Sequence, residues 1–144
     1  MRIASILAIA AVTVPLTVLV QFAGAQENTH PGEALYGEWI IQEMIFKGVD
    51  QEASKYGGWV RIKKDSFELS TNSESLGAKC PCTIRPGEMD IKTPWSTIKA
   101  LYELKDGRLW IAWMNNFNGE RPTNFDALKD PRLTLYVLKK RPAK

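Results

Sequence analysis

Short apolar runs separated by turn signals are the feature that most constrains the fold of this chain. About eight such runs recur between residues 35 and 138, and turn residues follow roughly every 8 to 12 positions. None of the runs has the spacing of a convincing amphipathic helix. The pattern is typical of an antiparallel β-barrel or sandwich. We expect a small, all-β, up-and-down barrel of about eight strands, because closure leaves no unpaired strand edge.

The strands can be placed by residue number. The predicted strands are 35–46, 59–63, 67–70, 83–85, 88–92, 98–104, 108–114 and 132–138. Asp106-Gly107 between two of them is a strong hairpin signal. In the first strand, Trp39, Ile41 and Ile45 share one face of a period-2 pattern that Glu43 interrupts, and the other face is also largely apolar. This strand is therefore predicted to be central.

Residues 1–25 have the features of a secretory signal peptide. A basic Arg2 precedes an apolar run from Ile3 to Val20, and a small-x-small triplet ends at Ala25. An uncleaved membrane anchor is the alternative, because the run is close to the length that spans a bilayer. Pro15 within the run favours cleavage. We expect a secreted or periplasmic protein with no membrane span after cleavage.

The rest of the chain is predicted to be a flexible linker, 26–34, followed by one domain, 35–144. The linker holds His30, the only histidine, which we expect to be solvated. Its position removes the commonest general base from the domain, so no catalytic residue, cofactor or metal site is predicted. The 19 basic and 16 acidic residues alternate without a basic block, so nucleic acid is not an expected partner.

Three motifs in order resemble a known domain family. They are Leu35-Tyr36-Gly37-Glu38-Trp39, the hairpin from Leu101 to Leu109, and Arg121-Pro122-Thr123-Asn124-Phe125. Together they resemble the lipocalin-like domain that recurs in small secreted proteins of planctomycete bacteria, over about residues 35 to 141. The resemblance implies a lipocalin-like β-barrel of unassigned function. The hairpin departs from the family pattern, because Asp106 precedes Gly107 instead of following it.

The Gly37-x-Trp39 step is also similar to the first-strand motif of true lipocalins. That likeness implies that Trp39 packs at the closed end of the barrel under an arginine near the last strand. A guanidinium can stack on an indole, and Gly37 would let the chain pass close by. Arg121 and Arg141 are the favoured candidates, with Arg132 as a third.

Aromatic residues are the candidate ligand-lining groups. These candidates are Trp59, Tyr102, Trp110, Trp113 and Tyr136. The alternative is that they only fill the core and its rim. Trp110 and Trp113 have opposite parity on one strand, so at most one points inward. The other is expected to be exposed or covered by a loop or a partner.

Cys80-Pro81-Cys82 is the short motif of the sequence that most suggests a chemical role. Two thiols outside the cytoplasm tend to pair, although a ring closed over two residues is strained. Cys80 and Cys82 are therefore a disulfide candidate, and unpaired or intermolecular thiols, a redox role and a metal site remain alternatives. The metal alternative lacks a second cluster of ligands.

Two functions fit these predictions. The first is non-catalytic binding of a small, partly apolar molecule inside the barrel. The second is a protein-interaction or inhibitor module of the cell envelope, with a filled barrel and an exposed contact surface. The sequence does not separate them.

Overall fold

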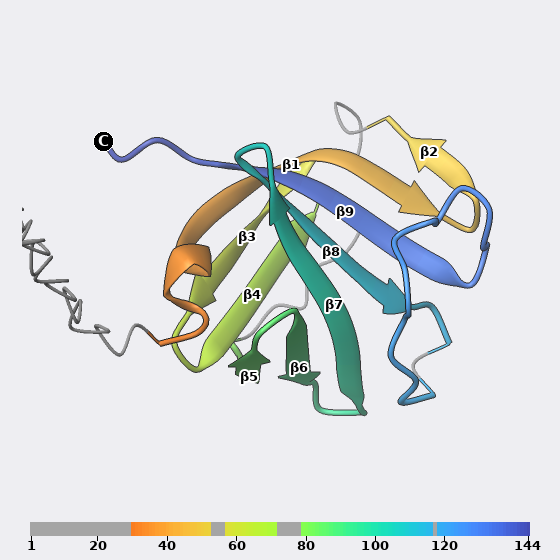
Figure 1. Ribbon diagram of the computed structural model, residues 1–144, viewed down its shortest axis with the longest axis horizontal. Helices are drawn as coiled ribbons and strands as arrows, with labels where there is room; N and C mark the ends of the chain where they lie inside the picture. Colours follow the sequence, from red (N-terminus) through yellow and green to blue (C-terminus); the bar gives the residue numbers. More distant parts are fainter. Residues whose placement is uncertain (1–29, 53–56, 72–78, 117) are drawn as a thin grey trace, which may run out of the picture.

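The computed structural model describes residues 30–52, 57–71, 79–116 and 118–144. The predicted signal peptide, 1–25, and the start of the predicted linker lie outside these residues. Within them, nine strands form one antiparallel sheet, preceded by a short 3-10 helix (Figure 1). The elements are η1 (Glu33–Leu35), β1 (Gly37–Phe46), β2 (Val49–Gln51), β3 (Gly58–Lys63), β4 (Ser66–Thr71), β5 (Cys80–Arg85), β6 (Glu88–Lys92), β7 (Thr97–Lys105), β8 (Arg108–Met114) and β9 (Leu133–Lys140).

The sheet closes on itself. From β3 to β9 each strand pairs with the next along the chain, and β1 pairs with both β3 and β9. Strands β1 and β3 to β9 therefore make a closed eight-stranded antiparallel barrel, which confirms the predicted fold class. The ninth strand, β2, pairs only with the C-terminal end of β1, at Met44–Phe46. It was not predicted, because this strand is short and its residues are mostly exposed.

β1 is central, as its two apolar faces predict, but its period-2 pattern shifts along its length. The pairing with β9 changes register between Ile41 and Glu43. Beyond this bulge the parity is reversed, because one extra residue turns every later side chain to the opposite face. Met44 thus joins Trp39 in the barrel interior, and Ile45 lies in a separate cluster outside. The expectation that Ile45 shares a face with Trp39 was wrong.

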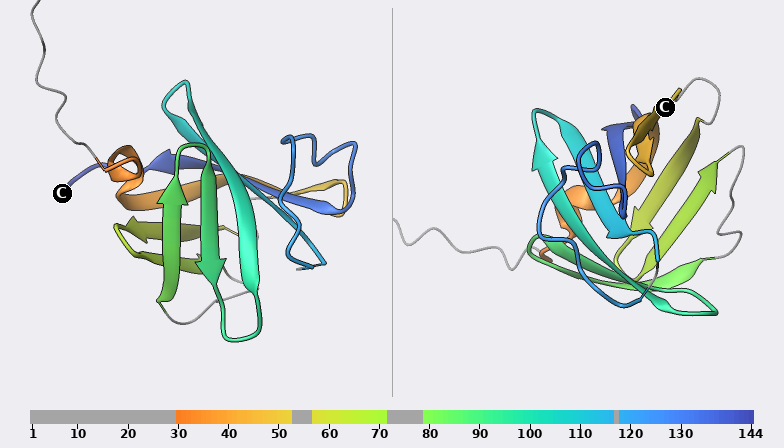
Figure 2. Two further views of the ribbon diagram at one scale, coloured as in Figure 1. Left: turned by 60° about the horizontal axis from the view of Figure 1, so that its bottom comes forward. Right: turned by 90° about the vertical axis from the view of Figure 1, so that its right-hand side faces the viewer.

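The buried apolar residues that the structure describes form two clusters. The larger lies inside the barrel and takes side chains from all eight barrel strands, among them Ile62, Phe67 and Ile111. The smaller lies on the outer face of β8, β9 and the end of β1, at Ile45, Ala112, Met114, Leu133, Leu135 and Val137. Residues 118–132, here called the strap, run beside the far ends of β8 and β9 (Figure 2). Ala127 of the strap belongs to the outer cluster, and Phe125 packs against it. The strap therefore gives the outer wall a hydrophobic core of its own.

One end of the barrel is closed by η1. Leu35 is buried in the interior cluster, and Gly32 lies so close to Ile84 that a Cβ there would be 2.9 Å from its side chain. The turns at 64–65, 86–87 and 106–107 lie at this closed end, because the strands alternate in direction. The β6–β7 turn and the strap belong to the opposite end, here called the far end.

The folded domain begins before residue 35. His30, predicted to be solvated within a flexible linker 26–34, shares a 2.7 Å hydrogen bond between its Nδ1 and the hydroxyl of Tyr36. The backbone N–H of Gly32 donates to the same nitrogen. Composition could not show this, because the two contacts depend on how η1 folds back on β1.

Candidate functional site

Trp39 anchors the closed end of the barrel. Its side chain is buried, and the indole N–H donates a 2.8 Å hydrogen bond to the carbonyl of Leu35 in η1. This bond joins the 3-10 helix to the first strand and satisfies the polar atom of a buried ring. Gly37 precedes it with φ +127°, a conformation that other residues rarely adopt. The structure thus places both residues where the Gly-x-Trp motif predicts a structural anchor.

The cation beside Trp39 is a lysine rather than one of the predicted arginines. Lys140 Nζ lies 5.4 Å from the centroid of the indole, because Lys140 is the β9 residue paired with Trp39. Arg141 instead forms an ion pair with Glu38, and Arg121 lies on the outer wall with Asp90. The expected stacking of Arg121 or Arg141 on Trp39 was therefore wrong. Lys140 provides the charge without planar stacking, since an ammonium is a compact point charge.

Two of the five candidate lining residues lie together in the barrel interior. Trp113 on β8 and Tyr136 on β9 are both buried, and their ring centroids are 5.0 Å apart with a 41° tilt. Both belong to the interior cluster. Tyr102 packs against the same cluster at the closed end, where its hydroxyl donates a 2.8 Å hydrogen bond to the carbonyl of Arg85. Burial raises the pKa of this phenol.

The other two candidates lie outside the barrel. Trp110 packs edge-on against Phe125 of the strap, with centroids 6.3 Å apart. This confirms that only one of Trp110 and Trp113 points inward and that a loop covers the other. Trp59 alternates with the buried Val60 on β3, and the Arg61 guanidinium lies 4.6 Å from its ring centroid. Trp59 and Trp110 therefore do not line the interior.

Cys80 and Cys82 are free thiols within the interior cluster. They point to the same face of β5 because they are two residues apart on a strand. Residues at this spacing are roughly 6.6 Å apart along an extended strand, too far between Cβ atoms for a disulfide. Burial raises the pKa of Cys80, and burial with the nearby Asp65 raises that of Cys82 to about 11. The disulfide prediction was wrong, and both thiols behave as small apolar groups of the core.

The interior is thus closed at one end and lined almost wholly by apolar groups. The polar atoms of Trp39 and Tyr102 bond to the backbone, and the two thiols are protonated at neutral pH. Among the described residues, no three His, Cys, Asp or Glu side chains come together as a metal site would need. None of the buried side-chain polar atoms described lacks a hydrogen-bond partner. In the part of the chain that the structure describes, the interior therefore presents apolar side chains and no acid–base pair.

Arg121 fastens the strap to the outer wall. Its guanidinium donates to the carbonyls of Ala100 and Met89 and forms an ion pair with Asp90 on β6. The Asp90 carboxylate also forms an ion pair with the Arg85 guanidinium, at 2.9 Å. Burial alone would raise the pKa of Asp90, but the hydrogen bonds and charges of the two arginines outweigh it and hold that pKa below its ordinary value.

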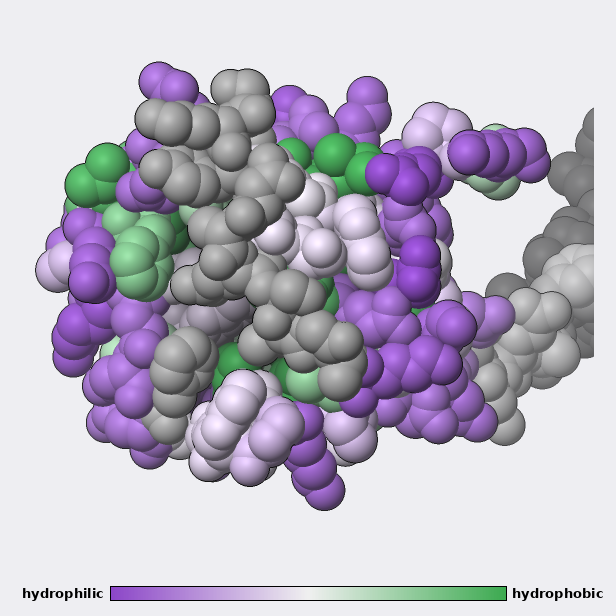
Figure 3. All heavy atoms as spheres, turned by 180° about the vertical axis from the view of Figure 1, so that it is seen from behind, coloured by the Kyte–Doolittle hydropathy of each residue, from purple (hydrophilic) through white to green (hydrophobic). Residues whose placement is uncertain are grey.

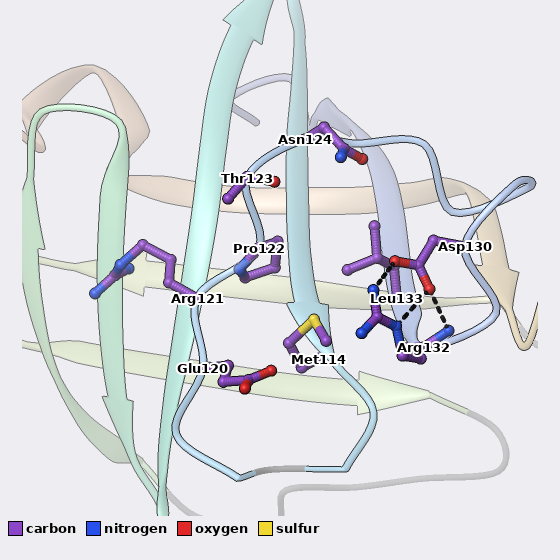
Figure 4. Close-up of a pocket in the computed structure, with 9 residues that line it drawn as sticks. All are labelled: Met114, Glu120, Arg121, Pro122, Thr123, Asn124, Asp130, Arg132 and Leu133. Atoms are coloured by element: carbon purple, nitrogen blue, oxygen red, sulfur yellow. Dashed lines mark hydrogen bonds and ion pairs between the residues drawn. The ribbon is translucent and has the colours of Figure 1, made fainter.

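A cleft of about 290 Å³ lies between the strap and the ends of β8 and β9 (Figure 4). Its lining residues are Met114, Glu120, Arg121, Pro122, Thr123, Asn124, Asp130, Arg132 and Leu133. The Arg121 side chain points out of it toward β6, and Arg132 is bound by Asp130 at 2.8 Å. Both guanidinium groups therefore already hold a carboxylate. Neither Arg121 nor Arg132 therefore offers an unpaired positive charge that would select an anionic ligand in this cleft.

Two shallower clefts, of about 360 and 600 Å³, meet at Gly37 and Glu38 on the closed end. Arg61, Lys63, Lys64, Lys140 and Arg141 line them. Glu38 binds both Arg61 and Arg141, and Arg61 also holds Glu68 at 3.0 Å. Hydrophilic side chains gather around the C-terminal tail that leaves this end (Figure 3). Charged side chains, several of them paired with one another, therefore surround Gly37 and Glu38 at the closed end.

Comparison with known proteins gives structural likeness but no match in sequence. No family model and no curated protein matches the chain. A solved structure of a mutant of the fluorescent protein UnaG is similar with a TM-score of 0.44 and 10% sequence identity. The match covers 77% of this chain and 99% of that chain. The barrel assignment rests on the strand pairings of this chain. No helix among the described residues is long and apolar enough to span a membrane.

Proposed function

We propose that this protein binds a small apolar molecule inside its barrel, as a non-catalytic, secreted or periplasmic protein of the lipocalin-like kind. The observation that carries the proposal is the interior cluster. It draws apolar side chains from all eight barrel strands, and η1 closes one end of it. An eight-stranded barrel is just wide enough either to fill with its own side chains or to hold one small ligand.

The lining sets the chemistry of the ligand. Trp113 and Tyr136 present adjoining aromatic faces, and their neighbours on β8 and β9, Ile111 and Leu138, are apolar. A charged ligand would lose its hydration without finding a counter-ion there, which is costly. A hydrocarbon or aromatic molecule gains from burial in proportion to its apolar area. The ligand class is therefore apolar, with at most a few polar atoms.

A second candidate follows from a different observation. Ile62, Phe67 and Ile91 are completely inaccessible to solvent, as the side chains of a filled barrel would be. In that case the protein is an interaction or inhibitor module of the cell envelope and acts through its outer surface. The two candidates differ in whether anything enters the barrel.

Binding of a probe separates them. We expect native mass spectrometry of the purified protein to show a bound small molecule, and oleyl alcohol to displace the neutral fluorescent probe N-phenyl-1-naphthylamine saturably. Trp113→Phe, inside the barrel, should weaken probe affinity about fourfold or more. The matched change Trp59→Phe, outside the barrel, should leave it unchanged. No bound molecule and no saturable displacement would overturn ligand binding and favour the filled-barrel module.

The proposed location has its own test. Expression of the full chain in a bacterial host, followed by N-terminal sequencing of the exported protein, should give a chain that begins at Gln26. A chain that keeps residues 1–25 and stays with the membrane would support the uncleaved anchor instead.

A further inference from the structure

Trp95 is the most exposed large apolar side chain in the described part of the chain. It is 86% accessible, whereas Trp39 and Trp113 are buried. It lies in the turn between β6 and β7, at the far end of the barrel. Figure 2 shows that this hairpin projects further from the barrel than the adjacent end of β5. Its indole buries little apolar area within the protein and is therefore available to bury that area against another surface.

The turn that carries Trp95 is held rigidly. The Thr93 hydroxyl accepts hydrogen bonds from the backbone N–H groups of Trp95, at 3.3 Å, and Ser96, at 3.0 Å. The Thr93 N–H donates to the carbonyl of Ser96 at 2.8 Å, and Pro94 fixes its own backbone angle. The tip is therefore already ordered, and binding through it costs little conformational entropy.

Basic side chains flank the tip on the outer wall. Lys92 ends β6 and pairs with Thr97, and Lys99 follows two residues further along β7. Both lysines are exposed and share the outer face, because the alternate residues Ile91 and Ile98 point inward. The sequence between Asp90 and Glu103 holds no carboxylate. The tip thus combines one projecting indole with two cations.

We propose that the β6–β7 hairpin docks this protein on an anionic lipid surface, with Trp95 entering the interfacial layer and Lys92 and Lys99 facing the headgroups. Indole rings favour the membrane–water interface, and basic residues near an anionic membrane add attraction. A single projecting side chain suits a lipid layer better than a protein partner, since a stable protein interface needs about 800 Å² on each side.

This proposal does not rest on ligand binding in the barrel. Docking through Trp95 would bring the far end of the barrel to the membrane and leave the closed end, with Trp39 and Lys140, facing away. A failure of ligand binding leaves membrane docking standing, and the reverse also holds.

Vesicle co-sedimentation tests the docking. The chain from Gln26 is suitable, because η1 and all nine described strands lie within it and the apolar run of residues 3–20 does not. We expect it to bind vesicles of equal parts phosphatidylglycerol and phosphatidylcholine, and to bind pure phosphatidylcholine at least about tenfold more weakly. Brominated lipids should quench the fluorescence of Trp95, and this quenching should be absent in Trp95→Ala.

Matched variants show whether the hairpin is responsible. Trp95→Ala should lower vesicle affinity about tenfold or more. Leu104→Ala removes an exposed apolar side chain at the closed end of β7, away from the hairpin tip, and should have no effect. Lys92→Glu with Lys99→Glu should remove the preference for anionic vesicles. The proposal is overturned if no vesicle binds, if Trp95→Ala binds as well as the parent, or if only Lys140→Glu with Arg141→Glu abolishes binding.

Discussion

Arg121 of the strap and Asp90 of β6 form an ion pair across the outer wall of the barrel, although 31 positions separate them in the chain. The same guanidinium donates to the carbonyl of Ala100 on β7. One side chain therefore connects three segments, the strap and two strands. The strap covers the outer cluster because this side chain fastens it at one end and Phe125 packs on Trp110 further along.

Loss of Arg121 should loosen the strap. We expect Arg121→Ala to lower the free energy of unfolding by roughly 1 to 3 kcal/mol, because it leaves the half-buried Asp90 with Arg85 alone and two carbonyls without this donor. Chemical denaturation measures this loss, and amide exchange should quicken over residues 118–132. Arg132→Ala is the control, since its pair with Asp130 is largely exposed and should contribute less than about 1 kcal/mol. Equal losses in the two variants would contradict a clamp at Arg121.

Acid should weaken the same contact. The pKa of Asp90 in the folded protein lies below its ordinary value of 3.8, so its contribution to stability is complete above that value and is lost as pH falls through the folded pKa. The stability difference between the parent protein and Asp90→Asn should be constant above about pH 5 and shrink below about pH 4. Thermal melts at a series of pH values would show this. A difference that grows in acid would contradict the lowered pKa.

Trp39 should be one of the most costly core residues to remove. Trp39→Ala should destabilise the domain by about 3 to 5 kcal/mol, since it empties a large buried site and frees the carbonyl of Leu35. Trp39→Phe keeps most of the ring and should cost less. An unchanged melting temperature in Trp39→Ala would contradict its role in closing the barrel.

The two cysteines should be unreactive in the folded state. Cys82 has a pKa of about 11 and Cys80 a raised pKa, so few thiolates exist at pH 8, and both groups are buried. Ellman's reagent should label the native protein slowly and label both thiols at once in guanidinium chloride. Rapid labelling of native protein, or an intact mass that lacks two hydrogens, would contradict free buried thiols.

Strand pattern and turn chemistry predict the barrel because both are local properties. The alternation on β7 and β8 and the Asp106-Gly107 turn, where both residues have positive φ, specify a hairpin without knowledge of the rest of the chain. The parity of Trp110 and Trp113 likewise predicts which residues share a face. The same reasoning gives the wrong face for Ile45, because a bulge shifts the register before it. Glu43 marks where the alternating pattern breaks, but the sequence does not show to which face the following side chains turn.

Contacts between distant segments are what the sequence does not reveal. Nothing in the composition of residues 118–132 shows that they cross the outer wall, or that Arg121 reaches Asp90 rather than Trp39. The register of β9 against β1 decides that Lys140 takes the place beside Trp39. The exposure of Trp95 was also not predicted. The segment Thr93-Pro94-Trp95-Ser96 lies between two strands, and a tight turn at that place offers an indole few neighbours to pack against.

The pairing of β1 with β9 also bears on how the protein folds. It joins Trp39 to Lys140, near opposite ends of the domain, and it runs along β1 as far as Phe46. The barrel can therefore close only after the last strand has been synthesised, and the loop-closure entropy of about a hundred residues opposes it. Folding should be slow for a domain of this size, since contacts of such long range dominate its topology. Until the barrel closes, β1 and β9 each have an edge with unpaired backbone N–H and C=O groups, and both strands carry exposed apolar side chains. The chain should be most prone to aggregate at this stage.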